Sequence, residues 1–294
     1  MSSTHNRKFF DFIIFSNLFI AFCAVVMAGY TTHLFSIGFP PSHFGWFLFF
    51  STLASYSIHW YLTDEKTEIT DSRTFWLGRN KPVHLFFFVS SAIGSGIFLL
   101  QELGYIKWII PAIFLTIMYT APKFPFKPFF VLRKVIYAKT ILLAVMWTYI
   151  TSILPLLVTT KEWEVGFTLF AINRFTLIFP ICILFDLRDR DYDKAGGVKS
   201  LVTILSPLQI KYLFDFLISV NVVSAILMLN FENLKIIDLL ILLVPTLLTF
   251  ALYHRAVKTK NDYLFYFILD GLMALSPLLY FAKLIYENTI AAVG

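Results

Sequence analysis

Apolar runs of about membrane-crossing length follow one another along the whole chain, separated by shorter polar stretches. A helix needs about 20 predominantly apolar residues to cross the hydrocarbon core of a bilayer. The runs lack the apolar–polar alternation of barrel strands, so each is predicted to be an α-helix that satisfies its own backbone hydrogen bonds. Nine spans are predicted, over residues 9–29, 43–62, 83–101, 105–121, 136–158, 164–185, 208–229, 236–253 and 263–285.

The composition of the chain agrees with this pattern. Of its 294 residues, 58% are hydrophobic and only 14% are charged, and the mean hydropathy is +0.75. A soluble protein cannot bury that much apolar surface in its core, whereas a lipid bilayer can cover it. No Gly/Pro-rich linker or compositional break divides the sequence. We therefore expect an all-α integral membrane fold made of a single domain, residues 1–294.

Basic residues gather in alternate loops of this predicted topology. The N-terminus and the 2–3, 4–5, 6–7 and 8–9 loops hold seventeen of them: Arg7, Lys8, Lys66, Arg73, Arg79, Lys81, Lys123, Lys127, Arg133, Lys134, Arg188, Arg190, Lys194, Lys199, Arg255, Lys258 and Lys260. The opposite loops hold only Lys107, Lys161 and Lys235. The positive-inside rule then places the N-terminus and the first set of loops in the cytoplasm and the C-terminus outside. The net charge of +6 is thus read as a topology signal, and no nucleic-acid partner is predicted.

Carboxylates cluster where the sixth predicted span ends, in the stretch FDLRDRDYDKAGGVKS at residues 185–200. If the helix continues past the membrane, Asp189 and Asp193 are four residues apart and share a face, with Asp186 one turn earlier. Three carboxylates on one face repel one another unless a cation neutralises them. Mg²⁺ is a suitable cation, because proteins usually hold it with one or two carboxylates plus substrate phosphate oxygens.

Basic side chains are interleaved with these carboxylates. Arg188 and Arg190 are placed to clamp phosphate groups, and Lys199 follows after a flexible AGG. A ligand with a diphosphate head and an apolar tail would suit this end of a helical bundle. The alternative is a solvated loop in which Arg and Asp merely pair, which is the usual meaning of a charge run.

The stretch DRDYDKAGGVKS resembles the second aspartate-rich motif of the UbiA superfamily of intramembrane prenyltransferases. In that family a D-x-x-x-D pair precedes a Gly and a Lys–Ser/Thr, and Asp189, Asp193, Gly197, Lys199 and Ser200 occupy those places here. The resemblance extends over the chain, because nine helices in a UbiA-type bundle are also the architecture of the family.

A second signature is YTAPK, which resembles the Y-x-x-x-K of the same family at the end of the fourth span. The resemblance implies that Lys123 helps to bind diphosphate and that Tyr119 lines the site. It further implies a Mg²⁺-dependent transfer of a prenyl group from a prenyl diphosphate to an aromatic or lipid acceptor in the membrane. On this interpretation Asp189 and Asp193 are catalytic metal ligands supported by Asp186.

The first aspartate motif of the family, N-x-x-x-D-x-x-x-D, is degenerate in this chain. The corresponding YSIHWYLTD has Tyr56 in place of Asn and Trp60 in place of the first Asp, and only Asp64 remains as a predicted metal ligand. Three nearby basic residues are candidates to compensate: His59 could bind either the metal or phosphate, and Arg73 and Arg79 could bind phosphate directly. Either one metal acts together with these basic groups, or catalysis has been lost or changed.

This departure keeps a rival function open, namely a non-catalytic protein on the same fold that binds or transports an isoprenoid lipid. Arg174, near the middle of the sixth span, is costly in a membrane and therefore suggests a role. Asp270 in the ninth span is its most natural charge partner by rarity. The pair is interpreted either as a brace between two helices or as part of an acceptor site or polar pathway.

Overall fold

The computed structural model describes residues 2–63, 72–120, 139–159, 162–195, 199–231 and 234–293, and every element within these ranges is helical. The elements are α1 (Ser2–Phe15), α2 (Leu18–Leu34), α3 (Ser42–Tyr61), α4 (Ser72–Arg79), α5 (Lys81–Gln101), η1 (Leu103–Tyr105), α6 (Ile106–Thr120), α7 (Lys139–Thr148), η5 (Tyr149–Ile153), α8 (Leu154–Thr159), α9 (Val165–Ala195), α10 (Leu201–Ile204), α11 (Pro207–Phe231), α12 (Ile236–Lys258), η6 (Leu264–Leu269) and α13 (Asp270–Val293). Of these, η5 and η6 are π-helical segments.

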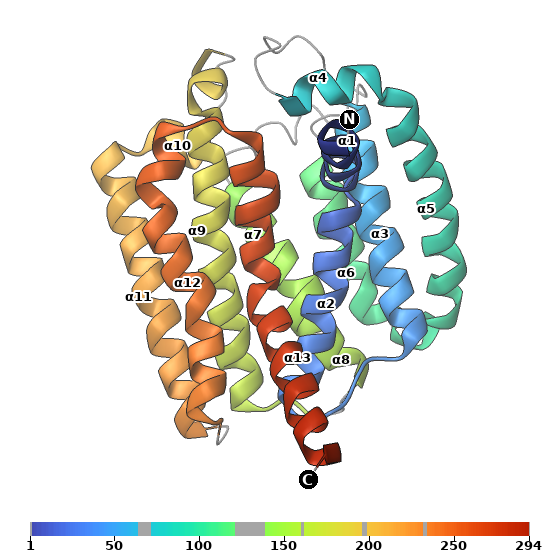
Figure 1. Cartoon of the computed structure of the whole chain (residues 1–294), viewed down its shortest axis with the longest axis vertical. Coiled ribbons are helices and arrows are strands. Elements are labelled where there is room, and N and C mark those ends of the chain that lie inside the picture. The colour runs from blue at the N-terminus through green and yellow to red at the C-terminus, as the bar shows by residue number, and fades with distance from the viewer. Residues whose placement is uncertain are drawn as a thin grey trace.

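The helices form one bundle, with the N-terminus, α4 and α10 at one end and the C-terminus at the other (Figure 1). In the described part of the chain, seven helical segments are long and apolar enough to cross a membrane, and an eighth is obtained if the bent pair α1–α2 counts as one span. The protein is therefore a multi-pass integral membrane protein. The 20-residue helix α3 matches the predicted span 43–62 in length, but its Ser, His and Tyr residues leave it outside that set.

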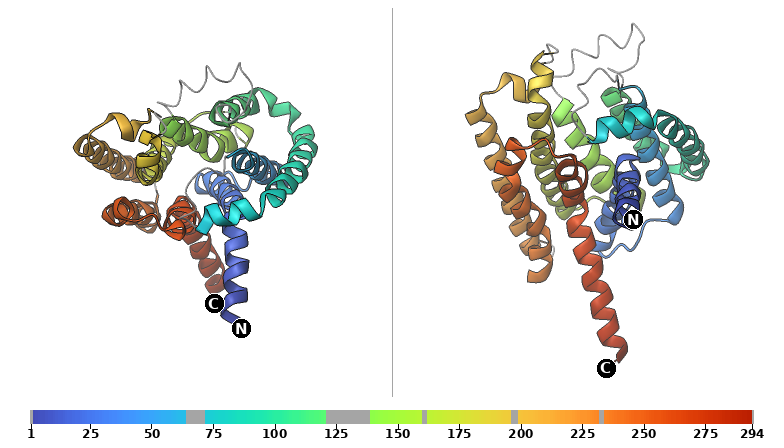
Figure 2. Two further views of the ribbon diagram at one scale, coloured as in Figure 1. Left: turned by 90° about the horizontal axis from the view of Figure 1, so that it is seen from above. Right: turned by 45° about the horizontal axis from the view of Figure 1, so that its top comes forward.

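The first predicted span, 9–29, was expected to be one continuous helix, and this expectation is wrong. The helices Arg7–Phe15 and Leu18–Leu34 meet at an angle of 61°. Asn17, at the break, has a φ of 71°, a left-handed conformation that Asn adopts more readily than most residues. The bend turns α1 out of the bundle, as the view from above in Figure 2 shows. It also directs the Asn17 side chain into the site described below.

The close packing of helix α5 against helix α3 depends on a glycine. A Cβ atom on Gly94 of α5 would lie 2.9 Å from Cγ of Phe50 on α3, so only glycine allows this approach. Small residues serve the same purpose wherever membrane helices pack backbone to backbone.

Buried amides join α9, α11 and α12. The Asn173 side chain donates to the Asn221 carbonyl over 3.0 Å, and the Asn221 side chain donates back to the Asn173 carbonyl over 2.7 Å. Thr246 then donates to Asn221 Oδ1 over 2.6 Å. In the hydrocarbon core no water is present as an alternative hydrogen-bond partner for these groups, so the network fixes the three helices relative to one another.

We expect Asn221→Leu to lower the free energy of unfolding by about 2 kcal/mol, because it removes the side-chain hydrogen bonds of Asn221 to the Asn173 carbonyl and to the hydroxyls of Thr176 and Thr246. Thermal unfolding in detergent measures the effect. Ser219→Ala is the matched control, since Ser219 lies on the exposed face of the same helix. Equal unfolding temperatures for the two variants would contradict a stabilising network.

Candidate functional site at the aspartate end of the bundle

The predicted continuation of the sixth span is confirmed, because α9 runs to Ala195. Its 31 residues span about 46 Å, whereas the hydrocarbon core is about 30 Å thick. Asp186, Asp189 and Asp193 lie on this last part of α9, at the end of the bundle that also carries α4 and α10 (Figure 1).

Asp186 is the most deeply buried of the three carboxylates, with 7% of its surface exposed. It accepts a hydrogen bond from the hydroxyl of Thr140 at the start of α7. Lys139, the first residue of α7, interacts electrostatically with all three aspartates. The beginning of α7 thus supplies a cation to the aspartate face of α9.

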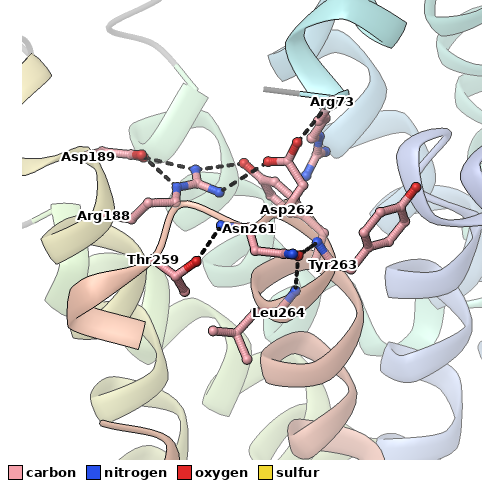
Figure 3. Close-up of polar contacts among 9 residues, drawn as sticks. Arg73, Arg188, Asp189, Thr259, Asn261, Asp262, Tyr263 and Leu264 are labelled. Carbon is pink, nitrogen blue, oxygen red and sulfur yellow. Dashed lines mark hydrogen bonds and ion pairs between the residues drawn. The ribbon is translucent and has the colours of Figure 1, made fainter. Parts of the chain in front are cut away.

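Arg188 connects the aspartates of α9 to the segment that precedes α13 (Figure 3). Its Nε and Nη2 donate to the two carboxylate oxygens of Asp189 over 2.7 and 3.2 Å. Nη2 also donates to the Tyr266 hydroxyl over 2.7 Å, and Nη1 lies 4.0 Å from Asp262 Oδ1. Only 8% of the Arg188 side chain is exposed, so this charge is held inside the protein.

Arg73 approaches the same tyrosine from α4. Its guanidinium carbon lies 4.0 Å from the ring centroid of Trp60 and 3.6 Å from that of Tyr266, so the cation contacts both rings, which are themselves inclined to each other by 83°. Its backbone N–H donates to Asp262 Oδ2 over 2.7 Å, and its Nη2 donates to Asn17 Oδ1 over 3.2 Å. Burial lowers the pKa of Arg73, while Tyr266 and nearby carboxylates oppose that shift.

The residues of the degenerate first motif form an aromatic layer beside these charges. Tyr56 accepts a hydrogen bond from Trp147 Nε1 over 3.0 Å. The His59 ring is stacked on Tyr119, with centroids 5.0 Å apart and planes inclined by 16°. Trp60 presents its face to the guanidinium of Arg73 rather than a carboxylate to a metal.

The remaining predicted site residues are not all gathered here. Arg190 contributes a buried Nε that has no hydrogen-bond partner among the described residues. Lys199 is exposed, and Arg79 is an exposed residue whose guanidinium lies 5.5 Å from the ring centroid of Phe75. The predicted ligands Asp64 and Lys123, and also Gly197, lie outside the described residues.

The fit of these residues to Mg²⁺ differs between the two sides of the site. In the described residues there is no group of three or more His, Cys, Asp or Glu side chains that could hold a metal ion. On the α9 side, Asp189 and Asp193 match the small carboxylate set that Mg²⁺ needs when substrate phosphates complete its shell. On the α3 side, tyrosine and tryptophan offer no such ligand.

Sequence reasoning missed Lys139, Tyr266 and Asp262. A lysine inside the apolar run 136–158 was a usable signal, because charges within a span are rare and functional. Tyr266 lies in the π-helical segment η6, and the chain pattern gives no indication that this tyrosine joins two arginines.

The expected Arg174–Asp270 pair is wrong. Arg174 donates to the Met273 carbonyl over 3.1 Å, and the part of the chain that the structure describes contains no ion pair between it and Asp270. The cations that act on Asp270 are instead Arg73 and Arg188. The rarity of charge in a span therefore drew attention to Arg174 and Asp270, but it could not predict which groups each of them contacts.

The fold is thus that of a multi-pass integral membrane protein in which acidic and basic side chains gather at one end of the helical bundle. Residues 63–269 match the UbiA prenyltransferase family. The chain belongs to this family of transferases, whose members typically depend on Mg²⁺, and membership implies prenyl transfer from a prenyl diphosphate. No significant match was found among curated proteins or among solved structures.

Proposed function

We propose that this protein is a Mg²⁺-dependent prenyltransferase that transfers a prenyl group from its diphosphate to an aromatic or lipid acceptor within the membrane. The observation that supports this best is the set of contacts around Tyr266. Arg188 binds both Asp189 of α9 and the Tyr266 hydroxyl, and Arg73 of α4 contacts the ring of the same tyrosine. A carboxylate suited to bind a metal ion and two guanidinium groups suited to bind phosphate therefore lie together at one end of the bundle.

The reaction needs one bond to break and one to form. The C1–O bond of the prenyl diphosphate breaks heterolytically, and the electron pair leaves with the diphosphate. The allylic cation is then captured by an electron-rich atom of the acceptor, which gives up a proton. Negative charge grows on the departing diphosphate, so fixed cations aimed at it lower the barrier.

The described residues provide such cations. Arg188 would donate to the diphosphate from inside the protein, and Arg73 and Arg190 would extend the same surface. Asp189 and Asp193, with Asp186 behind them, would hold Mg²⁺, which when bound supplies further positive charge at the diphosphate. Lys123, Lys199 and Asp64 are proposed to complete the site from the loops.

The aromatic residues have a different part in this proposal. Tyr119, stacked on His59, would form the wall between the charged end and the apolar interior. An allylic cation reacts with water if water reaches it, so a wall of rings protects the intermediate until the acceptor attacks.

The proposed topology has nine spans, with α3 as the ninth helix that crosses. An odd number of spans agrees with termini at opposite ends of the bundle (Figure 1). The concentration of basic residues then places the aspartate end in the cytoplasm and the C-terminus outside.

The rival is a non-catalytic protein that binds or transports an isoprenoid lipid. The replacement of Asn by Tyr56 and of the first Asp by Trp60 favours it, because two of the three ligand positions of the first motif now hold aromatic rings. The transferase remains the better proposal, since α9 keeps its three aspartates and buries Arg188 beside them.

Diphosphate release in proteoliposomes tests the transferase. With geranylgeranyl or farnesyl diphosphate and a membrane extract as acceptor source, release should require Mg²⁺, and Asp193→Ala should reduce it at least about 100-fold. Asp191→Ala is the matched control, because Asp191 is exposed on the same turn of α9 and should retain activity. Binding of the prenyl diphosphate without release, in the wild type and with any acceptor, would instead identify a binder or carrier.

A further inference from the structure

Arg73 lies in surroundings that are unusual for an arginine at a helix end. Only 4% of it is exposed, and its guanidinium lies against the rings of Trp60 and Tyr266. The side chain has one hydrogen bond within the described residues, from Nη2 to Asn17 Oδ1. Its Nε is buried and has no hydrogen-bond acceptor in that part of the chain.

A second guanidinium lies on the same ring. The guanidinium carbon of Arg188 is 4.8 Å from the Tyr266 centroid, and its Nη1 is also buried without a hydrogen bond to a described residue, at 4.0 Å from Asp262. Two buried cations that contact the same ring repel each other, and unpaired buried donors are costly. An anion with several acceptor oxygens would relieve both penalties, and a diphosphate is such an anion.

Trp60 stands where the resembling family has the first carboxylate of its first motif. A tryptophan cannot ligate Mg²⁺, but its ring face attracts an organic cation, and arginine is the usual partner. The same position therefore still attracts positive charge, and the charge comes from the chain itself.

We propose that the guanidinium of Arg73, in contact with the rings of Trp60 and Tyr266, is a built-in cation that takes the place of one divalent metal ion at the diphosphate. This inference rests on the proposed function for the identity of the anion. It implies that part of the affinity for a diphosphate persists when no divalent cation is present.

Equilibrium binding without turnover tests the proposal. The probes are inorganic pyrophosphate and a non-hydrolysable thio analogue of geranylgeranyl diphosphate, offered to the full chain in detergent with a chelator present. The wild type should bind the analogue, and Arg73→Gln should weaken this binding about 10–100-fold, the range expected for charge-assisted hydrogen bonds. Arg73→Lys should restore only part of it, because an ammonium group lacks the planar fork of donors with which a guanidinium binds phosphate oxygens.

The matched control is Arg255→Gln, which removes an exposed guanidinium from the end of α12 and should leave the affinity unchanged. A thermal unfolding curve for each variant separates loss of binding from loss of fold. Equal losses in Arg73→Gln and Arg255→Gln, or no binding by the wild type in chelator, would overturn the proposal.

A gain of metal dependence provides the second measurement. The double variant Trp60→Asp/Arg73→Gln exchanges the built-in cation for a carboxylate, so it should bind the analogue when Mg²⁺ is added but not in chelator. Recovery of less than about a tenth of wild-type affinity with Mg²⁺ would count against replacement of a metal.

These outcomes are distinguishable from failure of the proposed function. Chelator-resistant binding that depends on Arg73, without release of diphosphate from any substrate, would reject the transferase and keep the built-in cation. Release that depends on Mg²⁺ and Asp193, with no binding in chelator, would keep the transferase and reject the built-in cation.

Discussion

Replacing Arg188 with glutamine should lower the rate of diphosphate release by about 1,000-fold, the upper end of what one fixed donor contributes to a developing anion. The Arg188 side chain is buried, it makes two hydrogen bonds to Asp189 and one to Tyr266, and its Nη1 has no acceptor among the residues that the structure describes. Glutamine keeps the polarity but removes the charge that would balance the departing diphosphate. Single-turnover release in proteoliposomes measures the step directly.

Arg188→Lys separates charge from geometry in the same assay. A lysine keeps the positive charge but cannot reach Asp189 and Tyr266 with one rigid fork, so we expect it to recover no more than about a tenth of the activity. The exposed Arg255→Gln again serves as control for loss of a cation at this end of the bundle. Full activity in Arg188→Lys would show that only the charge matters.

The loss of diphosphate release expected for Arg188→Gln has to be distinguished from a loss of folded protein. Removing one member of a buried ion pair also leaves the other charge uncompensated, which costs stability. Thermal unfolding and the affinity for the non-hydrolysable analogue should therefore be measured beside the rate. A variant that unfolds like the wild type, yet loses both analogue affinity and release, identifies Arg188 as a ligand of the diphosphate.

The sequence predicts the architecture well because hydrophobic length is a strong local signal. Seven of the predicted spans coincide with long apolar helices, and the i, i+4 spacing of Asp189 and Asp193 holds because α9 extends past the bilayer thickness. The second and the first spans are the exceptions. The second forms the helix α3 but falls outside this apolar set, and the first is broken at Asn17, whose side chain contacts Arg73, a residue far away in the chain.

The candidate site is less accessible to such reasoning, because its key contacts join residues far apart in the chain. Tyr266 and Arg188 are 78 positions apart, and Asp262 and Arg73 are 189 apart. The sequence marks Arg73 as a candidate phosphate ligand near the degenerate motif, but nothing local indicates that Trp60 and Tyr266 contact its guanidinium. The degenerate motif did give a warning, because a tryptophan in place of a carboxylate required a different source of charge.

The buried guanidinium of Arg174 is expected to lower the stability of the folded protein. It is 1% exposed and donates from Nη1 to the Met273 carbonyl, while its Nε and Nη2 have no hydrogen-bond partner among the described residues. The rings of Tyr30 and Phe170 lie 5.2 and 5.1 Å from its guanidinium carbon. These contacts offset only part of the cost of burying an unpaired charge.

Arg174→Met should therefore raise the free energy of unfolding, by about 1–4 kcal/mol, since an apolar side chain of similar length fills the space without a charge to desolvate. Thermal unfolding in detergent measures the change. Ile172→Met is the matched control, because Ile172 lies on the exposed face of the same helix and its replacement should leave the unfolding temperature nearly unchanged.

The rate of diphosphate release should hardly change in Arg174→Met. Nineteen residues separate Arg174 from Asp193 on α9, so the two lie about 28 Å apart along the helix axis. Diphosphate release should stay within about threefold of the wild type, because screened interactions over that distance are small. A variant that is less stable than the wild type would contradict this view, since the unpaired donors would then have a partner in the folded protein that methionine cannot replace.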